Sequence, residues 1–94
     1  MAIRSFRDRE TRRLFERERS KAVPGDVQRV ALRKLNQLHY AEGLDDLRVP
    51  PGNRLERLTG SRAGQYSVRI NRQYRVCFLW DEGDAYEVEV TDYH

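Results

Sequence analysis

Three residues of this sequence have side chains suited to acid–base cleavage of RNA, although they lie far apart in the chain: Glu56, Arg75 and His94. Cleavage without a metal needs a base for the 2′-hydroxyl, a cation for the charge on the phosphate, and an acid for the leaving 5′-oxygen. A carboxylate, a guanidinium and an imidazole supply these functions, since imidazole titrates near neutral pH. Tyr93 adds an aromatic face for a base or a hydroxyl for a phosphate.

Each of these residues also has an ordinary structural interpretation. Glu56 is the single acid in residues 48–75, so it can be a salt-bridge partner of the surrounding arginines as well as a base. His94 ends the chain, where side chains are normally frayed and inert, although it directly follows a strong strand pattern. The spacing does not bring the residues together by itself, and both interpretations stay open.

The basic residues are concentrated in one stretch and are almost all arginine. Residues 48–75 hold seven arginines and one acid, for a net charge of +6, whereas residues 76–94 hold six acids and no Lys or Arg. Arginine pairs two-fold with phosphate, so the stretch is a suitable footprint for nucleic acid. A solvated surface or a dock for an acidic protein is the alternative, and high genomic GC content also enriches arginine.

Two helices are expected in the first half of the chain. Asp8 is a suitable N-cap for a helix to about Arg19, after an extended or strand-like segment over residues 3–6. Asp26 can cap a second helix, which Gly43 would end as the C′ residue. The apolar stripe of this helix consists of Val27, Val30, Ala31, Leu35, Leu38 and Ala41.

The second half changes to the alternation of β-strands. The two prolines of segment 44–53 predict a long loop. Strands are expected over residues 55–58, 66–70, 74–80 and 86–90, with hairpin-length connections between the last three. Tyr66, Val68, Ile70, Tyr74, Val76, Phe78, Trp80, Tyr86, Val88 and Val90 are the alternating apolar residues. We therefore expect an α+β domain with two N-terminal helices on one face of a small antiparallel sheet, and Arg69 and Arg75 side by side on the other face.

The composition excludes several classes of protein. The 94 residues predict a single domain, residues 1–94, and no apolar run of about 18 residues exists to span a membrane. The N-terminus has no apolar signal segment, so we expect a cytoplasmic protein. One cysteine and two histidines leave few ligands for a metal, and we expect no metal or cofactor. Cys77 is expected to be packed and inert, and His39 to be structural.

The segment Leu47–Asn71, with its Pro-Pro-Gly-Asn-Arg-Leu-Glu motif, resembles the HigB/GraT-type toxins of bacterial type II toxin–antitoxin modules. So do Tyr74-Arg75-Val76-Cys77-Phe78 and the terminal Asp92-Tyr93-His94. These toxins belong to the RelE superfamily, whose α+β fold has two N-terminal helices against a small antiparallel sheet. The resemblance covers almost the whole chain and implies the same layout as the periodicity.

The resemblance implies a ribosome-dependent endoribonuclease that cuts the mRNA codon in the A site without a metal and so arrests growth. It implies a cognate HigA-like helix-turn-helix antitoxin, and operator DNA as a partner only through the toxin–antitoxin complex. It implies that Glu56 is the general base, that Arg75 stabilises the scissile phosphate and that His94 is the general acid. It further implies that Tyr93 stacks on or orients the substrate, and that Asp92 matches the Asp of the HigB C-terminal ending. Many relatives have a lysine in the turn where this chain has Thr59. The arginines that would compensate by binding RNA or the ribosome are Arg54, Arg57, Arg62, Arg69 and Arg72.

Two other functions are compatible with the resemblance. The same superfamily includes ParE-like proteins that inhibit DNA gyrase without catalysis, although such a protein would be expected to lack the Asp92-Tyr93-His94 ending. A protein that only binds antitoxin and DNA, with catalysis decayed through loss of the turn lysine, is the third possibility. The first two functions are distinguished in expressing cells, because the nuclease would cause mRNA cleavage and the gyrase inhibitor would cause a DNA damage response.

Overall fold

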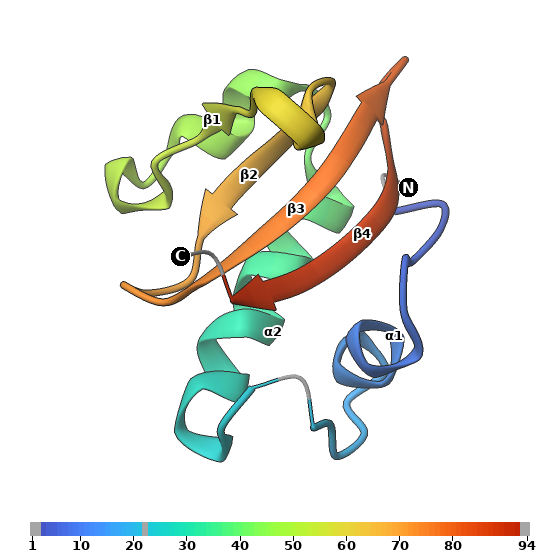
Figure 1. Ribbon diagram of the computed structural model, residues 1–94, viewed down its shortest axis with the longest axis vertical. Coiled ribbons are helices and arrows are strands. Elements are labelled where there is room, and N and C mark those ends of the chain that lie inside the picture. Colours follow the sequence, from blue (N-terminus) through green and yellow to red (C-terminus); the bar gives the residue numbers. More distant parts are fainter. Residues whose placement is uncertain (1–2, 22, 93–94) are drawn as a thin grey trace.

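A four-stranded antiparallel sheet forms the centre of the computed structural model, which describes residues 3–21 and 23–92. Its strands lie in chain order and are β1 (Glu56–Arg57), β2 (Gln65–Arg69), β3 (Tyr74–Asp81) and β4 (Asp84–Asp92) (Figure 1). Each strand pairs with the one before it, because the connections are too short for a crossover. The sheet therefore presents two complete faces.

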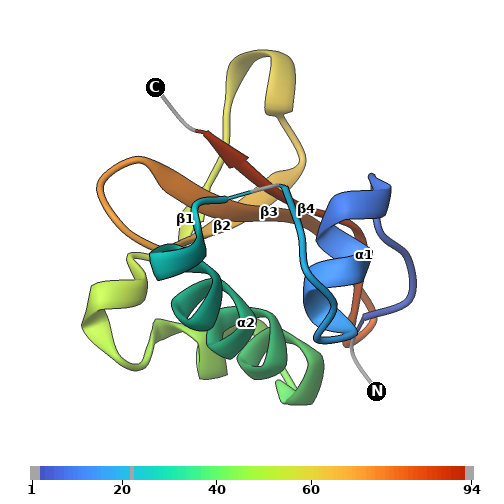
Figure 2. The ribbon, with the colours of Figure 1, turned by 90° about the horizontal axis from the view of Figure 1, so that it is seen from below.

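The two helices, α1 (Arg9–Phe15) and α2 (Gly25–Tyr40), cover the same face of this sheet (Figure 2). The buried residues of α2 pack against apolar side chains of β2, β3 and β4. The core includes Ala31, Leu35, Leu38, Val68, Val76, Phe78, Val88 and Val90. This confirms the expected α+β architecture, in which both α-helices lie on one face; the opposite face is here called the open face. No helix in residues 3–21 or 23–92 is long and apolar enough to cross a membrane.

The first helix is shorter than the sequence predicts. The Asp8 carboxylate accepts a hydrogen bond from the Thr11 amide at 2.7 Å, as expected of the N-cap. The helix nevertheless ends at Phe15 and not near Arg19, because Arg17 adopts a left-handed conformation with φ of 63°. Residues 16–19 are all charged and exposed. An extension of α1 through them would therefore bury no apolar surface.

Both ends of the second helix also differ from the prediction. The helix begins at Gly25 with Pro24 as its N-cap residue, and Asp26 lies inside the first turn, where the helix dipole favours a carboxylate. It ends at Tyr40, and Gly43 is extended with φ of −153°, so Gly43 is not a left-handed C′ stop. The chain instead turns at Gly43 into a 3₁₀ helix.

Segment 44–53 is more ordered than the long loop that the sequence predicts. It contains two 3₁₀ helices, Leu44–Arg48 and Pro51–Asn53. Leu47 and Asn53 are fully buried in this segment, so both an apolar and a polar contact hold it against the rest of the molecule. The prolines exclude an α-helix here but are compatible with these short turns.

The N-terminal segment is extended, as predicted, and runs beside β4 through isolated parallel bridges from Ile3 to Ala85 and from Phe6 to Val88. Next to this segment, Glu87 of β4 has a positive φ of 52°, and the register between β4 and β3 shifts. Tyr86 consequently pairs with Leu79 on the open face, and the prediction that it shares the face of Val88 is wrong. Ala85 takes that core position.

Candidate active site

The open face carries two rows of polar side chains in register across the strands. Side chains of directly paired residues project from the same face of a sheet. One row contains Glu56, Ser67, Cys77 and Glu89, from β1 through β4. The next row contains Arg69, Arg75 and Thr91. The expected pairing of the two arginines on the face opposite the helices is confirmed.

Arg75 is the buried centre of this site. Its Nε donates to the Ser67 hydroxyl at 2.7 Å, and its Nη2 donates to the carbonyl oxygen of Arg54 at 2.7 Å. Its Nη1 lies 3.9 Å from Oε1 of Glu56. Two different elements therefore fix the orientation of the guanidinium. A cation held in a fixed orientation is suited to stabilising negative charge that develops at one position.

Glu56 lies at the edge of the site and is accessible. It belongs to the two-residue strand β1, and its side chain is 52% exposed. Its contact with Arg75 is a long ion pair on a half-exposed carboxylate, which contributes little to stability. The structure thus brings together two of the three residues selected for their chemistry, with the acid next to the fixed cation.

The C-terminal candidates follow β4. Asp92 is exposed, pairs with Tyr74, and accepts a hydrogen bond from Nε2 of Gln73 at 2.9 Å. It comes directly after Thr91, which lies opposite Arg75. Tyr93 and His94 lie outside the described residues, so their roles as stacking group and general acid remain predictions.

The five arginines expected to contact RNA have different surroundings. Arg54, Arg57 and Arg72 are exposed, whereas Arg69 is half-buried and its Nε donates to the carbonyl of Asn71. Arg62 is held by Glu89, at 2.8 Å, and by the side chain of Gln65, at 3.0 Å. Of the exposed three, Arg54 contacts the site through its carbonyl, whereas Arg57 pairs with Tyr66 and so projects from the helix side of the sheet; Arg62 is part of the internal structure of the open face.

Glu89 is a residue of this face that the sequence analysis did not select. Its Oε1 contacts Arg62 and its Oε2 contacts Arg7 at 3.4 Å, and its side chain is 12% exposed. Through Arg62 it fastens the 3₁₀ turn Gly60–Arg62 to the sheet, on the side opposite α2 (Figure 2, yellow). Strand alternation could have placed Glu89 on the open face, but no local pattern identifies partners 27 and 82 residues away.

Cys77 is buried between Ser67 and Glu89 in the middle of the open face. Burial raises the pKa of its thiol; Glu89 raises it as well, while Arg62 and Arg75 oppose the change. We expect iodoacetamide to alkylate Cys77 in the folded protein at pH 7.5 more slowly than in urea by on the order of tenfold or more, because less thiolate is present and reagent access is poor. Mass spectrometry over time measures both rates, and equal rates would contradict the expectation.

His39 packs in the core and not in the site. Its Nδ1 accepts a hydrogen bond from the amide of Ile3 at 3.4 Å, and its ring contacts Phe15. Burial lowers the pKa of His39, which favours the neutral imidazole that can accept this bond. The structural role predicted for it is confirmed.

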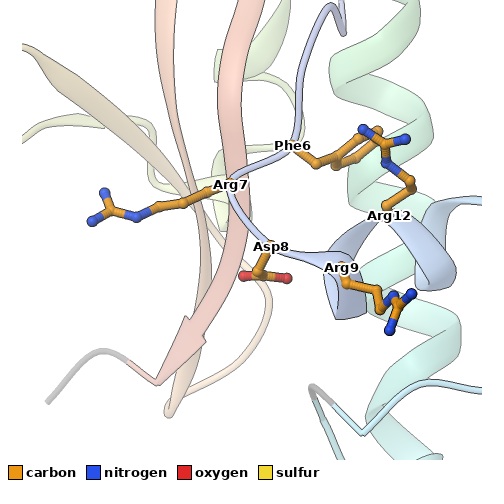
Figure 3. Close-up of a pocket in the computed structure, with 5 residues that line it drawn as sticks. All are labelled: Phe6, Arg7, Asp8, Arg9 and Arg12. Atoms are coloured by element: carbon orange, nitrogen blue, oxygen red, sulfur yellow. The ribbon is translucent and has the colours of Figure 1, made fainter.

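A hollow between the N-terminal segment and α1 is lined by Phe6, Arg7, Asp8, Arg9 and Arg12 (Figure 3). Figure 3 shows Arg7 pointing away from Arg9 and Arg12, and the guanidinium of Arg12 lies over the ring of Phe6 at 5.8 Å. The three cations do not converge on one position, so the open face remains the better candidate. Within the described residues, no group of three His, Cys, Asp or Glu side chains could hold a metal ion.

Comparison with known proteins identifies relatives over the full length. Residues 4–94 match the family described as the RelE-like toxin of type II toxin–antitoxin system HigB. The chain is 40% identical over 81 residues to Toxin HigB-1 of Vibrio cholerae, covering 85% of each sequence. It is 32% identical over 93 residues to Endoribonuclease HigB of Proteus vulgaris, covering 98% of this chain and 99% of that one. A chain of the YoeB–YefM complex from Staphylococcus aureus shares the fold, with a TM-score of 0.61 and 16% identity over 100% of this chain and 99% of that chain.

Proposed function

The chain belongs to the HigB family of RelE-like toxins from type II toxin–antitoxin systems, and we propose that it is an endoribonuclease that cuts mRNA in the ribosomal A site. The observation that carries this proposal is the accessible carboxylate of Glu56 beside the immobilised guanidinium of Arg75. The name of the Proteus vulgaris relative, Endoribonuclease HigB, supports the same activity.

In the proposed reaction, Glu56 removes the proton of the 2′-hydroxyl, and the 2′-oxygen attacks the neighbouring phosphorus. The bond from phosphorus to the 5′-oxygen breaks, and His94 donates a proton to the leaving oxygen. The products are a 2′,3′-cyclic phosphate and a 5′-hydroxyl. The reaction needs no metal ion, because these side chains supply the proton transfers and the positive charge.

Arg75 stabilises the charge that develops on the phosphate. Its Nε and Nη2 are bound to Ser67 and to the Arg54 carbonyl, so the guanidinium does not have to be ordered when the substrate arrives. A charge stabiliser that is already oriented is more effective than one that must reorganise during the reaction. Tyr93 stacks on a base of the codon, and Asp92 supports the C-terminal pair.

The ribosome completes this site in our proposal. The ribosome holds the mRNA against the open face, where the Glu56 carboxylate is half exposed and the Arg75 guanidinium is already oriented. Arg54, Arg57, Arg69 and Arg72 contact phosphates of the mRNA or ribosomal RNA, while Arg62 holds the turn that carries Thr59. Thr59 cannot replace a turn lysine as base or cation, so we assign the base to Glu56.

The proposed partner outside the ribosome is a HigA-like helix-turn-helix antitoxin. Membership of the toxin–antitoxin family supports an antitoxin, and the YoeB–YefM complex shares the toxin fold. Operator DNA is bound only through the antitoxin complex, and the protein acts in the cytoplasm. Co-expression with the neighbouring antitoxin gene should restore growth to cells that produce the toxin.

Expression in cells distinguishes this function from gyrase inhibition. We expect growth arrest with rapid cleavage of mRNA inside codons, mapped by sequencing of 5′-hydroxyl ends, and no early induction of the DNA damage response. Strong DNA damage without new mRNA ends would assign the protein to the gyrase inhibitors of the superfamily. Arrest with neither result would contradict both functions.

Substitution of Glu56 by Gln tests the assignment of the base. The change keeps the shape of the side chain but removes its basicity, so we expect cleavage to slow by about 10²- to 10⁴-fold. Because the carboxylate is half exposed, the free energy of unfolding should change by less than about 1 kcal/mol. Single-turnover cleavage and urea unfolding measure the two effects.

Glu42→Gln is the matched control, since Glu42 is an exposed acid beyond the end of α2 and outside the open face. It should leave both the cleavage rate and the stability unchanged. A Glu56→Gln variant with full activity would show that Glu56 is only a salt-bridge partner of Arg75.

A further inference from the structure

Asn53 is a fully buried polar residue at the end of the 3₁₀ helix Pro51–Asn53. Its Oδ1 accepts a hydrogen bond from Nζ of Lys34. Its Nδ2 donates to Oε1 of Gln37 at 2.9 Å and to the carbonyl of Leu47 at 3.1 Å, with a longer contact to the carbonyl of Val49 at 3.4 Å. Both ends of the amide are therefore used, and they tie α2 to the segment that leads into the site.

Lys34 is an unusual partner for this amide. It lies on α2 between apolar core residues and is 7% exposed, and burial lowers the pKa of its ammonium. Lysine is rarely buried without a partner, and an apolar residue would fill the same space without loss of hydration. A fully satisfied buried polar network instead specifies one arrangement of the elements that it joins.

The residue after Asn53 connects this network to the site. Arg54 has a left-handed backbone with φ of 44° and ψ of 58°, which is uncommon for a residue other than glycine. Such a conformation persists where the surrounding structure holds it. The turn directs the carbonyl of Arg54 to Nη2 of Arg75 at 2.7 Å, and Glu56 follows two residues later.

We propose that Lys34 and Asn53 are positioning residues for the chemistry of the open face. They fix the backbone at Arg54, whose carbonyl orients the guanidinium of Arg75, although neither side chain touches the substrate. The effect on cleavage rests on the proposed function, whereas the effect on Arg75 itself does not. The Lys34 ammonium acts as a hydrogen-bond donor to Asn53 and not through its charge.

The test combines an NMR measurement with kinetics on Lys34→Met and Lys34→Gln. Methionine fills the space without a donor, whereas the amide of glutamine can still donate to Asn53. In Lys34→Met we expect the Nη2 protons of Arg75, which donate to the Arg54 carbonyl, to exchange with solvent at least about tenfold faster, while the amides of β2 and β3 keep their protection. The single-turnover rate at saturating ribosomes should fall by about tenfold or more, with the half-saturating concentration within about twofold of wild type.

Lys34→Gln should recover most of both losses, which a requirement for charge would not allow. Lys21→Met, at an exposed lysine, is the matched control and should behave as wild type. If Lys34→Met does not fold, Gln37→Leu removes an acceptor of Asn53 at a half-buried position and is used in its place. If these Arg75 protons exchanged at the wild-type rate in a folded variant, the proposal would be overturned. This outcome does not depend on whether the wild-type protein cuts RNA.

Discussion

Replacement of His94 by alanine should lower the rate of mRNA cleavage by about 10²- to 10⁴-fold, the usual loss when a positioned proton donor is removed. The last described pair of β4 with β3, Asp92 with Tyr74, lies two residues before His94 and is not altered by the substitution. The substitution should therefore leave the free energy of unfolding and antitoxin binding unchanged. Single-turnover cleavage, urea unfolding and co-purification with the antitoxin measure the three properties.

Removal of Tyr93 and His94 together is a second form of this experiment. It should lower the rate at least as much as His94→Ala, because the stacking group is lost with the acid. Full cleavage activity in the truncated protein would contradict the assignment of the acid to the end of the chain.

Replacement of Arg75 by alanine should have a second large effect, about 10²- to 10³-fold on cleavage, as expected for the loss of an oriented charge stabiliser. It should also destabilise the fold by about 1–3 kcal/mol, because the buried Ser67 hydroxyl and the Arg54 carbonyl lose their donor. Cleavage must therefore be measured at a temperature where urea unfolding shows the variant to be folded.

Arg75→Lys separates charge from geometry at this position. Lysine keeps the positive charge but cannot donate to Ser67 and Arg54 while facing Glu56, so most of the activity should still be lost. Arg29→Ala, at an exposed arginine of α2, is the control for removal of an arginine and should be neutral. Wild-type cleavage by folded Arg75→Ala would exclude Arg75 from the reaction.

The features that follow from local periodicity were predictable. The alternation of apolar residues indicated β2, β3 and most of β4, and their faces followed, including the pairing of Arg69 with Arg75. The apolar stripe of α2 indicated the helix and its buried side. In a half-buried strand and in an amphipathic helix, apolar residues recur at a fixed spacing along the whole element, so single exceptions do not obscure the pattern.

The features that depend on distant contacts were not predictable. The altered phase at Tyr86 accompanies the N-terminal segment, where the hydroxyl of Ser5 accepts a hydrogen bond from the Glu87 amide. The end of α1 depends on the absence of any core for residues 16–19 to contact. Both are decided by elements that a local pattern does not include.

The same distinction applies to the site. Residue chemistry selected Glu56 and Arg75, but their meeting depends on the register of β1 with β2 and of β2 with β3. Asn53 belonged to a motif noted for its resemblance, yet its bond to Lys34 spans 19 residues and two different elements. Buried polar networks of this kind carry no periodic signal, which is why the sequence analysis assigned no role to Lys34 or Glu89.

Primer extension on a defined mRNA in a purified translation system, with and without ribosomes, tests the proposed activity most directly. Wild-type protein and His94→Ala are compared at equal concentrations. We expect cuts within the codon in the A site that require ribosomes and are lost with His94→Ala. Equal cutting of free mRNA, or no cutting by a protein that still arrests growth, would contradict a ribosome-dependent nuclease, and the second result would make the basic open face a docking surface for another target.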